Sequence, residues 1–222
     1  MRRLVIAIDG PSGAGKSTAG RALAERLGYT FIDTGAMYRA LALQALRAGR
    51  SLDRPEELLA LARDLRVELL PGGAVRLDGI DVSADIRTRE VSAAASQVSV
   101  HADVRREMVR KQQSLGAKGG VVLDGRDIGT AVFTAADVKF YLDADPARRA
   151  ARRHGELAAS GAPAELAAIE RDIRERDHLD MTRADSPLTC AADALVIDTS
   201  DLPPEQVVAR MLAVVNARSA ER

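Results

Sequence analysis

Short apolar runs alternate along the chain with longer segments in which apolar residues recur at helical spacing. Five of the runs stop at an aspartate: Leu4–Ile8 before Asp9, Thr30–Ile32 before Asp33, Val121–Leu123 before Asp124, Val138–Leu142 before Asp143 and Ala194–Ile197 before Asp198. Runs that are apolar throughout are typical of strands buried on both faces of a parallel sheet. Because α/β proteins build their sites at the carboxyl ends of such strands, these aspartates mark the edge where we expect a site.

Helical patterns fill the intervals between the predicted strands and the region after the last one. They cover Lys16–Arg26, Met37–Arg47, Pro55–Leu65, Val104–Ser114, Pro146–His154, Ala164–His178 and Pro204–Ala217. Alternation of strand and helix predicts a parallel sheet with helices on both faces. The predicted fold class is therefore α/β, with three layers built around a five-stranded parallel sheet.

One stretch departs from this alternation. The apolar segments Val67–Leu70, Ala74–Leu77 and Ile80–Val82 are separated by Gly72-Gly73 and by Asp78-Gly79, which are pairs that favour hairpin turns. We interpret residues 66–100, with approximate boundaries, as a small antiparallel insertion between two parallel strands. The length of 222 residues otherwise suits one domain of ordinary size.

Charge and aromatic content exclude several classes of protein. The 32 basic and 32 acidic residues give a net charge of zero, which argues against binding a nucleic acid polymer or an anionic membrane through overall charge. Three Tyr, three Phe and no Trp are too few for base-stacking platforms along a single strand. Only four of the basic residues are lysines, and biased codon composition explains the excess of arginine at least as well as phosphate binding does.

Cysteine usage and the short apolar runs bear on the cellular compartment. One cysteine cannot form a disulfide within the chain, and three histidines with one cysteine do not suffice for a typical zinc cluster. The longest apolar runs have five residues, which is too short to cross a bilayer or to form a signal-peptide core. We therefore expect a cytoplasmic protein.

A phosphate-binding loop is the most specific motif. The pattern G-x-x-x-x-G-K-[ST] is matched by Gly10-Pro11-Ser12-Gly13-Ala14-Gly15-Lys16-Ser17. This segment lies between a predicted strand and a predicted helix that begins with Lys16, Ser17 and Thr18. Its glycines let backbone N–H groups surround a phosphate, and the helix N-terminus adds partial positive charge. We expect Lys16 to contact the β- and γ-phosphates of ATP and Ser17 to offer its hydroxyl to Mg²⁺.

Asp124 is a candidate for the second group on the metal side of the site. It follows the apolar Val121–Leu123, and its carboxylate would hold Mg²⁺ through water, with Asp33 as a further candidate. The pattern is weak by itself because five predicted strands end in the same way. For Asp124 in isolation, an ordinary turn aspartate is an equal interpretation.

Missing motifs narrow the kind of phosphate-loop protein. A regulatory GTPase reads guanine with N-K-x-D, but the only asparagine is Asn216, and no aspartate is followed by glycine three residues later. A ring ATPase normally has a longer chain. Small-molecule kinases remain.

Several segments together resemble one kinase family. Asp33-Thr34-Gly35-Ala36-Met37-Tyr38-Arg39 is similar to the acceptor-phosphate turn of nucleoside-monophosphate kinases. With Asp124–Thr130, Ile86–Thr88, Ala94–Val98 and Arg176–Arg183, the pattern resembles the bacterial cytidylate kinases over nearly the whole chain. The insertion is itself a feature of that family. Ser17, where many relatives have Gly, and Thr34, where Ser is common, depart from the expected pattern.

The resemblance implies a single kinase domain with three functional parts. It spans residues 1–222, and the parts are a core of about 1–35, 101–145 and 185–222, an acceptor-binding region with the insert at about 36–100, and an arginine-rich lid at about 146–170. It implies that Arg39 and Arg126 clamp the acceptor phosphate and that Asp127 accepts the 4-amino proton of cytosine, as acidic side chains do in DNA grooves. The remaining acceptor-binding candidates are Thr34, Tyr38, Ser96, Arg105, Arg176, Asp180 and Arg183, of which Ser96 and Arg105 read the base and Arg183 lies near the transferred group.

Other interpretations of these positions stay open. Arg176, Asp180 and Arg183 fall at i, i+4 and i+7, which is also the pattern of a solvated helix with ion pairs between successive turns. Arg105 lies in a basic helical segment that can simply face solvent. Tyr38 is equally suited to the core.

An arginine-rich run follows the fourth predicted strand, with the sequence Arg148-Arg149-Ala150-Ala151-Arg152-Arg153. It places two pairs of like charges at i and i+4, which is unfavourable in a bare helix. A bound triphosphate would remove the repulsion, and the resemblance implies an arginine-rich lid at this place. Arg148, Arg152 and Arg153 are therefore candidate ATP ligands, with neutralisation by Glu156 and nearby carboxylates as the alternative.

The implied function is Mg²⁺-dependent, in-line phosphoryl transfer from ATP to CMP or dCMP by an expected monomer. The acceptor oxygen is already anionic, so no general base is required, and Lys16, Arg126, Arg152 and Arg183 act by positioning and charge neutralisation. Two alternatives remain. One is another small kinase with UMP, AMP or a metabolite hydroxyl as acceptor, and the other is a non-catalytic nucleotide-binding module.

Overall fold

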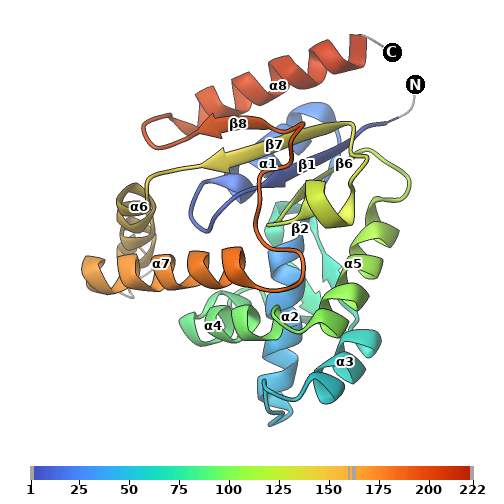
Figure 1. Cartoon of the computed structure of the whole chain (residues 1–222), viewed down its shortest axis with the longest axis vertical. Coiled ribbons are helices and arrows are strands. Elements are labelled where there is room, and N and C mark those ends of the chain that lie inside the picture. Colours follow the sequence, from blue (N-terminus) through green and yellow to red (C-terminus); the bar gives the residue numbers. More distant parts are fainter. Residues whose placement is uncertain (1–2, 160, 162–163, 221–222) are drawn as a thin grey trace.

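A five-stranded parallel sheet forms the centre of the molecule (Figure 1). The computed structural model describes residues 3–159, 161 and 164–220. The strand order is β2-β6-β1-β7-β8, and the strands are β1 Val5–Asp9, β2 Thr30–Asp33, β6 Val121–Asp124, β7 Val138–Asp143 and β8 Leu195–Asp198. Each strand ends at the predicted aspartate, so the predicted fold class and the shared carboxyl edge are confirmed.

Helices cover both faces of the sheet. α1 (Lys16–Leu27) and α8 (Pro204–Ala220) pack against Ile6 and Ile8 of β1 on one face, and α5 (Ala102–Gly116) lies over the other. Successive side chains of a strand point to opposite faces, so Ala7 joins the second layer and not the first. Both faces of the central strands are therefore buried against apolar side chains, as the uniformly apolar runs predicted.

The region between β2 and β6 is a second unit with its own core. It contains α2 (Thr34–Arg47), α3 (Pro55–Asp64), a three-stranded antiparallel sheet, α4 (Arg89–Val98) and α5. The small sheet joins β3 (Val67–Leu69), β4 (Val75–Leu77) and β5 (Ile80–Asp81), which confirms the predicted hairpins. The sequence patterns did not predict α4, although its N-cap has a recognisable signal: the Thr88 hydroxyl accepts from Val91 N at 3.3 Å.

A helical hairpin follows β7 where the sequence predicted a lid. α6 (Pro146–Ala159) packs along α7 (Leu166–Thr182) through Ala150, Ile169 and Ile173. Arg89 of α4 pairs with Asp172 of α7 at 2.8 Å, so the hairpin contacts the acceptor-side unit. Within the described ranges, no helix is long and apolar enough to cross a membrane.

The junction between β1 and the phosphate loop depends on a glycine. Gly10 has φ 141°, and a Cβ atom there would lie 1.9 Å from the main-chain oxygen of Leu142 in β7. Gly49 also has a positive φ, 61°, but a Cβ there would meet no atom within 4 Å. A side chain at Gly10 would therefore cause both backbone strain and steric collision, whereas a side chain at Gly49 would cause backbone strain alone.

We predict that Gly10→Ala lowers the free energy of unfolding by more than about 3 kcal/mol, because strain and collision with a backbone atom add. Gly49→Ala should cost only about 1 kcal/mol, the strain alone. Urea unfolding of both variants measures the difference. Equal losses would contradict the close approach of β1 and β7 at Gly10.

Candidate active site

The phosphate loop has the backbone that anion binding requires. Gly13 and Gly15 have φ of 79° and 84°, in the left-handed region that favours glycine. α1 begins directly after Gly15, with no side-chain cap and no acidic residue in its first turn. The first N–H groups and the positive end of the helix dipole are therefore left for an anion.

Lys16 is buried within this loop. Its Nζ donates to the main-chain oxygen of Pro11 at 2.6 Å. Burial, together with the charge of nearby Arg126, lowers the pKa of Lys16 to about 7, although the Asp124 carboxylate acts in the opposite direction. Negative charge placed in the loop would favour the ammonium form.

Three of the predicted metal-side groups lie together at the sheet edge. The Ser17 hydroxyl donates to Asp124 Oδ2 at 2.5 Å, whereas Asp124 Oδ1 is buried without a hydrogen-bond partner. Asp33 is the residue paired with Asp124 across β2 and β6. Burial and the Asp33 charge raise the pKa of Asp124 to about 7. Two neighbouring carboxylates and an unsatisfied oxygen form a site suited to a cation.

Two arginines predicted to clamp the acceptor phosphate are held by carboxylates. Arg39 pairs with Asp33 at 3.0 Å, and Arg126 Nε donates to Asp180 at 2.8 Å. Arg176 lies near them and its Nε has no partner, and burial, together with Arg126, lowers the pKa of Arg176 to about 10. Cations gathered in this way, with donors unused, form a site suited to a polyanion.

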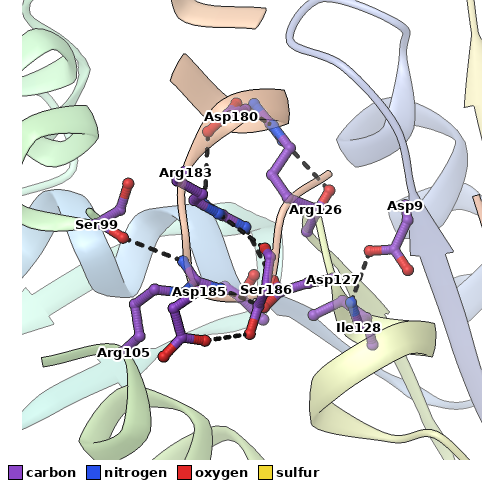
Figure 2. A network of polar contacts seen from close by, with 12 residues as sticks. Asp9, Ser99, Arg105, Arg126, Asp127, Ile128, Asp180, Arg183, Asp185 and Ser186 are labelled. Carbon is purple, nitrogen blue, oxygen red and sulfur yellow. Dashed lines mark hydrogen bonds and ion pairs between the residues drawn. The ribbon is translucent and has the colours of Figure 1, made fainter. Parts of the chain in front are cut away.

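A second part of the network centres on Asp127, as Figure 2 shows. Asp127 forms an ion pair with buried Arg105, and its other oxygen lies 3.7 Å from Arg183. Arg183 also lies 3.6 Å from Asp180 and donates through Nε to the main-chain oxygen of Ser186 at 2.8 Å. The guanidinium carbon of Arg105 lies 5.8 Å from the centre of the Tyr38 ring.

These contacts decide between the interpretations that the sequence left open. Asp180 and Arg183 are buried, so this end of α7 is not a solvated face, and Arg105 is likewise turned inward. Thr34 is buried, and its hydroxyl donates to the main-chain oxygen of Asp124 at 2.6 Å. Ser96 differs: its hydroxyl faces the main-chain oxygen of Ser92, and in the described ranges no hydrogen bond or ion pair links it to Asp127.

The arginines of α6 separate into two groups. Arg148 pairs with Asp201, Arg153 pairs with Glu156, and Arg152 donates to the main-chain oxygens of Thr199 and Ser200. The ion pair with Glu156 is the neutralisation that the sequence left as an alternative. None of these contacts of the three arginines involves the phosphate loop.

Arg149, absent from the predicted site residues, does contact the phosphate loop. It donates to the main-chain oxygens of Ser12 at 3.0 Å and Ala144 at 2.8 Å, and pairs with Asp177 at 2.7 Å. The sequence carries no signal that separates Arg149 from the neighbouring arginines, because its burial beside Ala150 depends on how α6 docks.

Asp9 is a second site residue that sequence reasoning missed. It is buried and accepts hydrogen bonds from the main-chain N–H groups of Ile128 and Gly129. Its signal was present, since Asp9 is the strand-end aspartate directly before the phosphate loop.

Comparison with known proteins identifies the family. The family model described as cytidylate kinase matches residues 6–217. A cytidylate kinase of Geobacillus kaustophilus is 49% identical over 98% of both chains, and one of Desulfitobacterium hafniense is 46% identical over 97% of this chain and 94% of its own. A gluconokinase structure from Sinorhizobium meliloti superposes with a TM-score of 0.53 at 19% identity, over 99% of this chain and 96% of that one, which supports the fold alone. The chain belongs to the cytidylate kinase family.

Proposed function

We propose that this protein transfers the γ-phosphoryl group of ATP to CMP or dCMP. The observation that carries the proposal is the pairing of two anion sites at one sheet edge. One is the open N-terminus of α1, and the other is the cluster of Arg39, Arg126 and Arg176. The names of the relatives, nearly half of whose residues are identical over the full length, favour a cytidine acceptor.

On the donor side, the loop backbone and Lys16 hold the triphosphate. Lys16 exchanges the Pro11 oxygen for phosphate oxygens. This exchange is favoured because the phosphates place negative charge beside a buried ammonium group. Arg149 contacts both Ser12 of the loop and Asp177 of α7, so it connects the donor loop to the helix that carries Arg176 and is followed by Arg183.

On the acceptor side, no residue has to remove a proton. A phosphate oxygen of CMP is anionic at neutral pH, so the chemistry needs alignment and charge compensation. Arg39, Arg126 and Arg176 hold this phosphate, and Arg183, whose Nη2 is buried without a hydrogen-bond partner, neutralises the transferred group.

Base recognition falls to the Asp127 network. Arg105 and Arg183 pair with the carboxylate of Asp127 and orient it, and a carboxylate has lone pairs left to accept the 4-amino protons of cytosine. Uracil has an acceptor oxygen in place of the 4-amino group, so it could not donate a hydrogen bond to this carboxylate. Tyr38 packs beneath Arg105 and fixes its plane. Ser96 and Thr34 stay predicted members of this pocket.

The residues present fit a magnesium ion. Ser17 and Asp124 would hold it, directly or through water, with Asp33 adjacent. Bound there, Mg²⁺ supplies charge neutralisation at the phosphates. The cytoplasmic location, the monomeric state, the lid and the boundaries of the three parts of the domain stay predictions.

We predict the highest kcat/KM with CMP or dCMP when ADP release is followed in a panel that also contains UMP and AMP. A strong preference for UMP would contradict the role of Asp127. Absence of stimulation by every nucleotide in the panel would contradict the kinase function and favour a non-catalytic binding module.

We predict that stability depends on pH through Asp124. Burial raises its pKa from 3.8 to about 7, so the stability contributed by the protonated carboxyl is fully present below pH 3.8 and is lost as the pH rises through 7. Relative to Asp124→Asn, the wild type should lose about 1 kcal/mol or more between pH 4 and 6.5 without divalent cations. Mg²⁺ at pH 8 should raise the Tm of the wild type and not that of the variant. Asp143→Asn, at an exposed strand end, is the control and should retain both responses.

We predict that Arg152→Ala lowers kcat about tenfold or more, as loss of charge neutralisation does, while it lowers the free energy of unfolding by less than about 1.5 kcal/mol. Arg174→Ala, which removes an exposed pair with Glu170 on α7, should change neither. Unchanged turnover in Arg152→Ala would remove Arg152 from the proposed lid and leave its contacts with Thr199 and Ser200 as its role.

A further inference from the structure

The carboxylate of Asp9 connects two segments that are far apart in the sequence. Asp9 is the last residue of β1 and directly precedes Gly10 of the phosphate loop. Its Oδ1 accepts from Ile128 N at 2.8 Å and its Oδ2 accepts from Gly129 N at 2.7 Å, and Figure 2 shows the first of these contacts. Only 4% of Asp9 is exposed, so both hydrogen bonds lie away from water.

Within the part of the chain that the structure describes, neither of these two N–H groups has a second acceptor. They open the π-helical turn Ile128–Val132, and the first donors of a helical turn lack partners within it. The turn itself closes on Asp127, whose main-chain oxygen accepts from Ala131 N at 2.8 Å and Val132 N at 3.1 Å. Asp9, at the end of β1, therefore caps the turn that directly follows Asp127.

The preceding residues are tied to the same strand. Gly125 N donates to the main-chain oxygen of Ile8 at 3.0 Å. The segment that carries Arg126 and Asp127 is thus held at both ends by the last two residues of β1. Space around it is small, since a Cβ atom on Gly129 would lie 3.0 Å from Lys139 and 3.4 Å from Asp9.

We propose that Asp9 is a positioning residue for acceptor recognition. Its two oxygens set the place of Arg126 and Asp127 relative to the phosphate loop, and so the distance between donor and acceptor. This inference rests on the proposed function, because it concerns how CMP is aligned with ATP. In-line transfer tolerates little misplacement of the acceptor, so a small shift of this segment has a large kinetic effect.

Asp9→Asn tests the proposal because it keeps the shape and removes one acceptor. The amide NH₂ would face a buried N–H donor, which must then move or stay unpaired. Burial raises the pKa of Asp9 to about 6, although the hydrogen bonds from Gly129 N and Ile128 N act in the opposite direction. Assays at pH 8 therefore compare the ionised carboxylate with the amide.

We expect Asp9→Asn to raise KM for CMP about tenfold and to narrow the ratio of kcat/KM between CMP and UMP, with KM for ATP changed less than threefold. Amide hydrogen exchange should be faster at Ile128 and Gly129. Asp137→Asn is the matched control: Asp137 is 8% exposed and accepts from Val5 N at 2.8 Å, at the opposite end of β1. It should lower the Tm without changing KM for CMP or the CMP/UMP ratio.

An active Asp9→Asn enzyme with wild-type KM and selectivity for CMP would overturn the proposal, as would equal effects of Asp9→Asn and Asp137→Asn on KM. If Asp9→Asn lowers the Tm too far for kinetics, hydrogen exchange at 10 °C decides: wild-type protection of Ile128 and Gly129 overturns the proposal. Failure of the proposed function has a different signature, since the wild-type protein itself would then not phosphorylate CMP.

Discussion

The structure depends on keeping a dense group of charges paired at the carboxyl edge of one parallel sheet. Lys16, Arg105 and Arg183 are all buried, and an isolated buried cation would be strongly unfavourable. Asp124, Asp127 and Asp180 compensate them, but incompletely, since Asp124 Oδ1 and Arg183 Nη2 lack hydrogen-bond partners. This incomplete pairing is where ligands gain affinity, because a phosphate supplies the acceptor that Arg183 Nη2 lacks and a cation would satisfy Asp124 Oδ1.

Much of this fold was predictable from sequence for a simple reason. A strand buried on both faces must be apolar throughout, and its end at the site must be polar, so five apolar runs with a terminal aspartate specify five strands and their common edge. The phosphate loop was predictable because its glycines require positive φ, which few other residues adopt. The small sheet followed from its Gly-Gly and Asp-Gly turns.

The parts that escaped prediction depend on contacts between distant segments. The four arginines of α6 look alike in sequence, and only the docking of α6 beside Ser12 and Asp177 separates Arg149 from the rest. Asp9 is one of five equivalent strand-end aspartates, and it is distinguished by a turn that begins 119 residues later at Ile128. The same limit applies to Asp124, whose raised pKa comes from burial and from Asp33 on the neighbouring strand.

The hydrogen-bonded pairing of β2 with β6 has a consequence for how such enzymes diversify. The chain leaves the sheet at Asp33 and returns at Val121 on the adjacent strand, and the intervening unit closes over a core of its own, which includes Leu41 and Met108. Apart from α5, which also packs on the sheet, this unit is thus independent of the geometry of the sheet. Tyr38, Ser96 and Arg105 can be remodelled with this unit, whereas Asp127 follows β6 of the sheet, so only part of the acceptor specificity can change apart from the donor half.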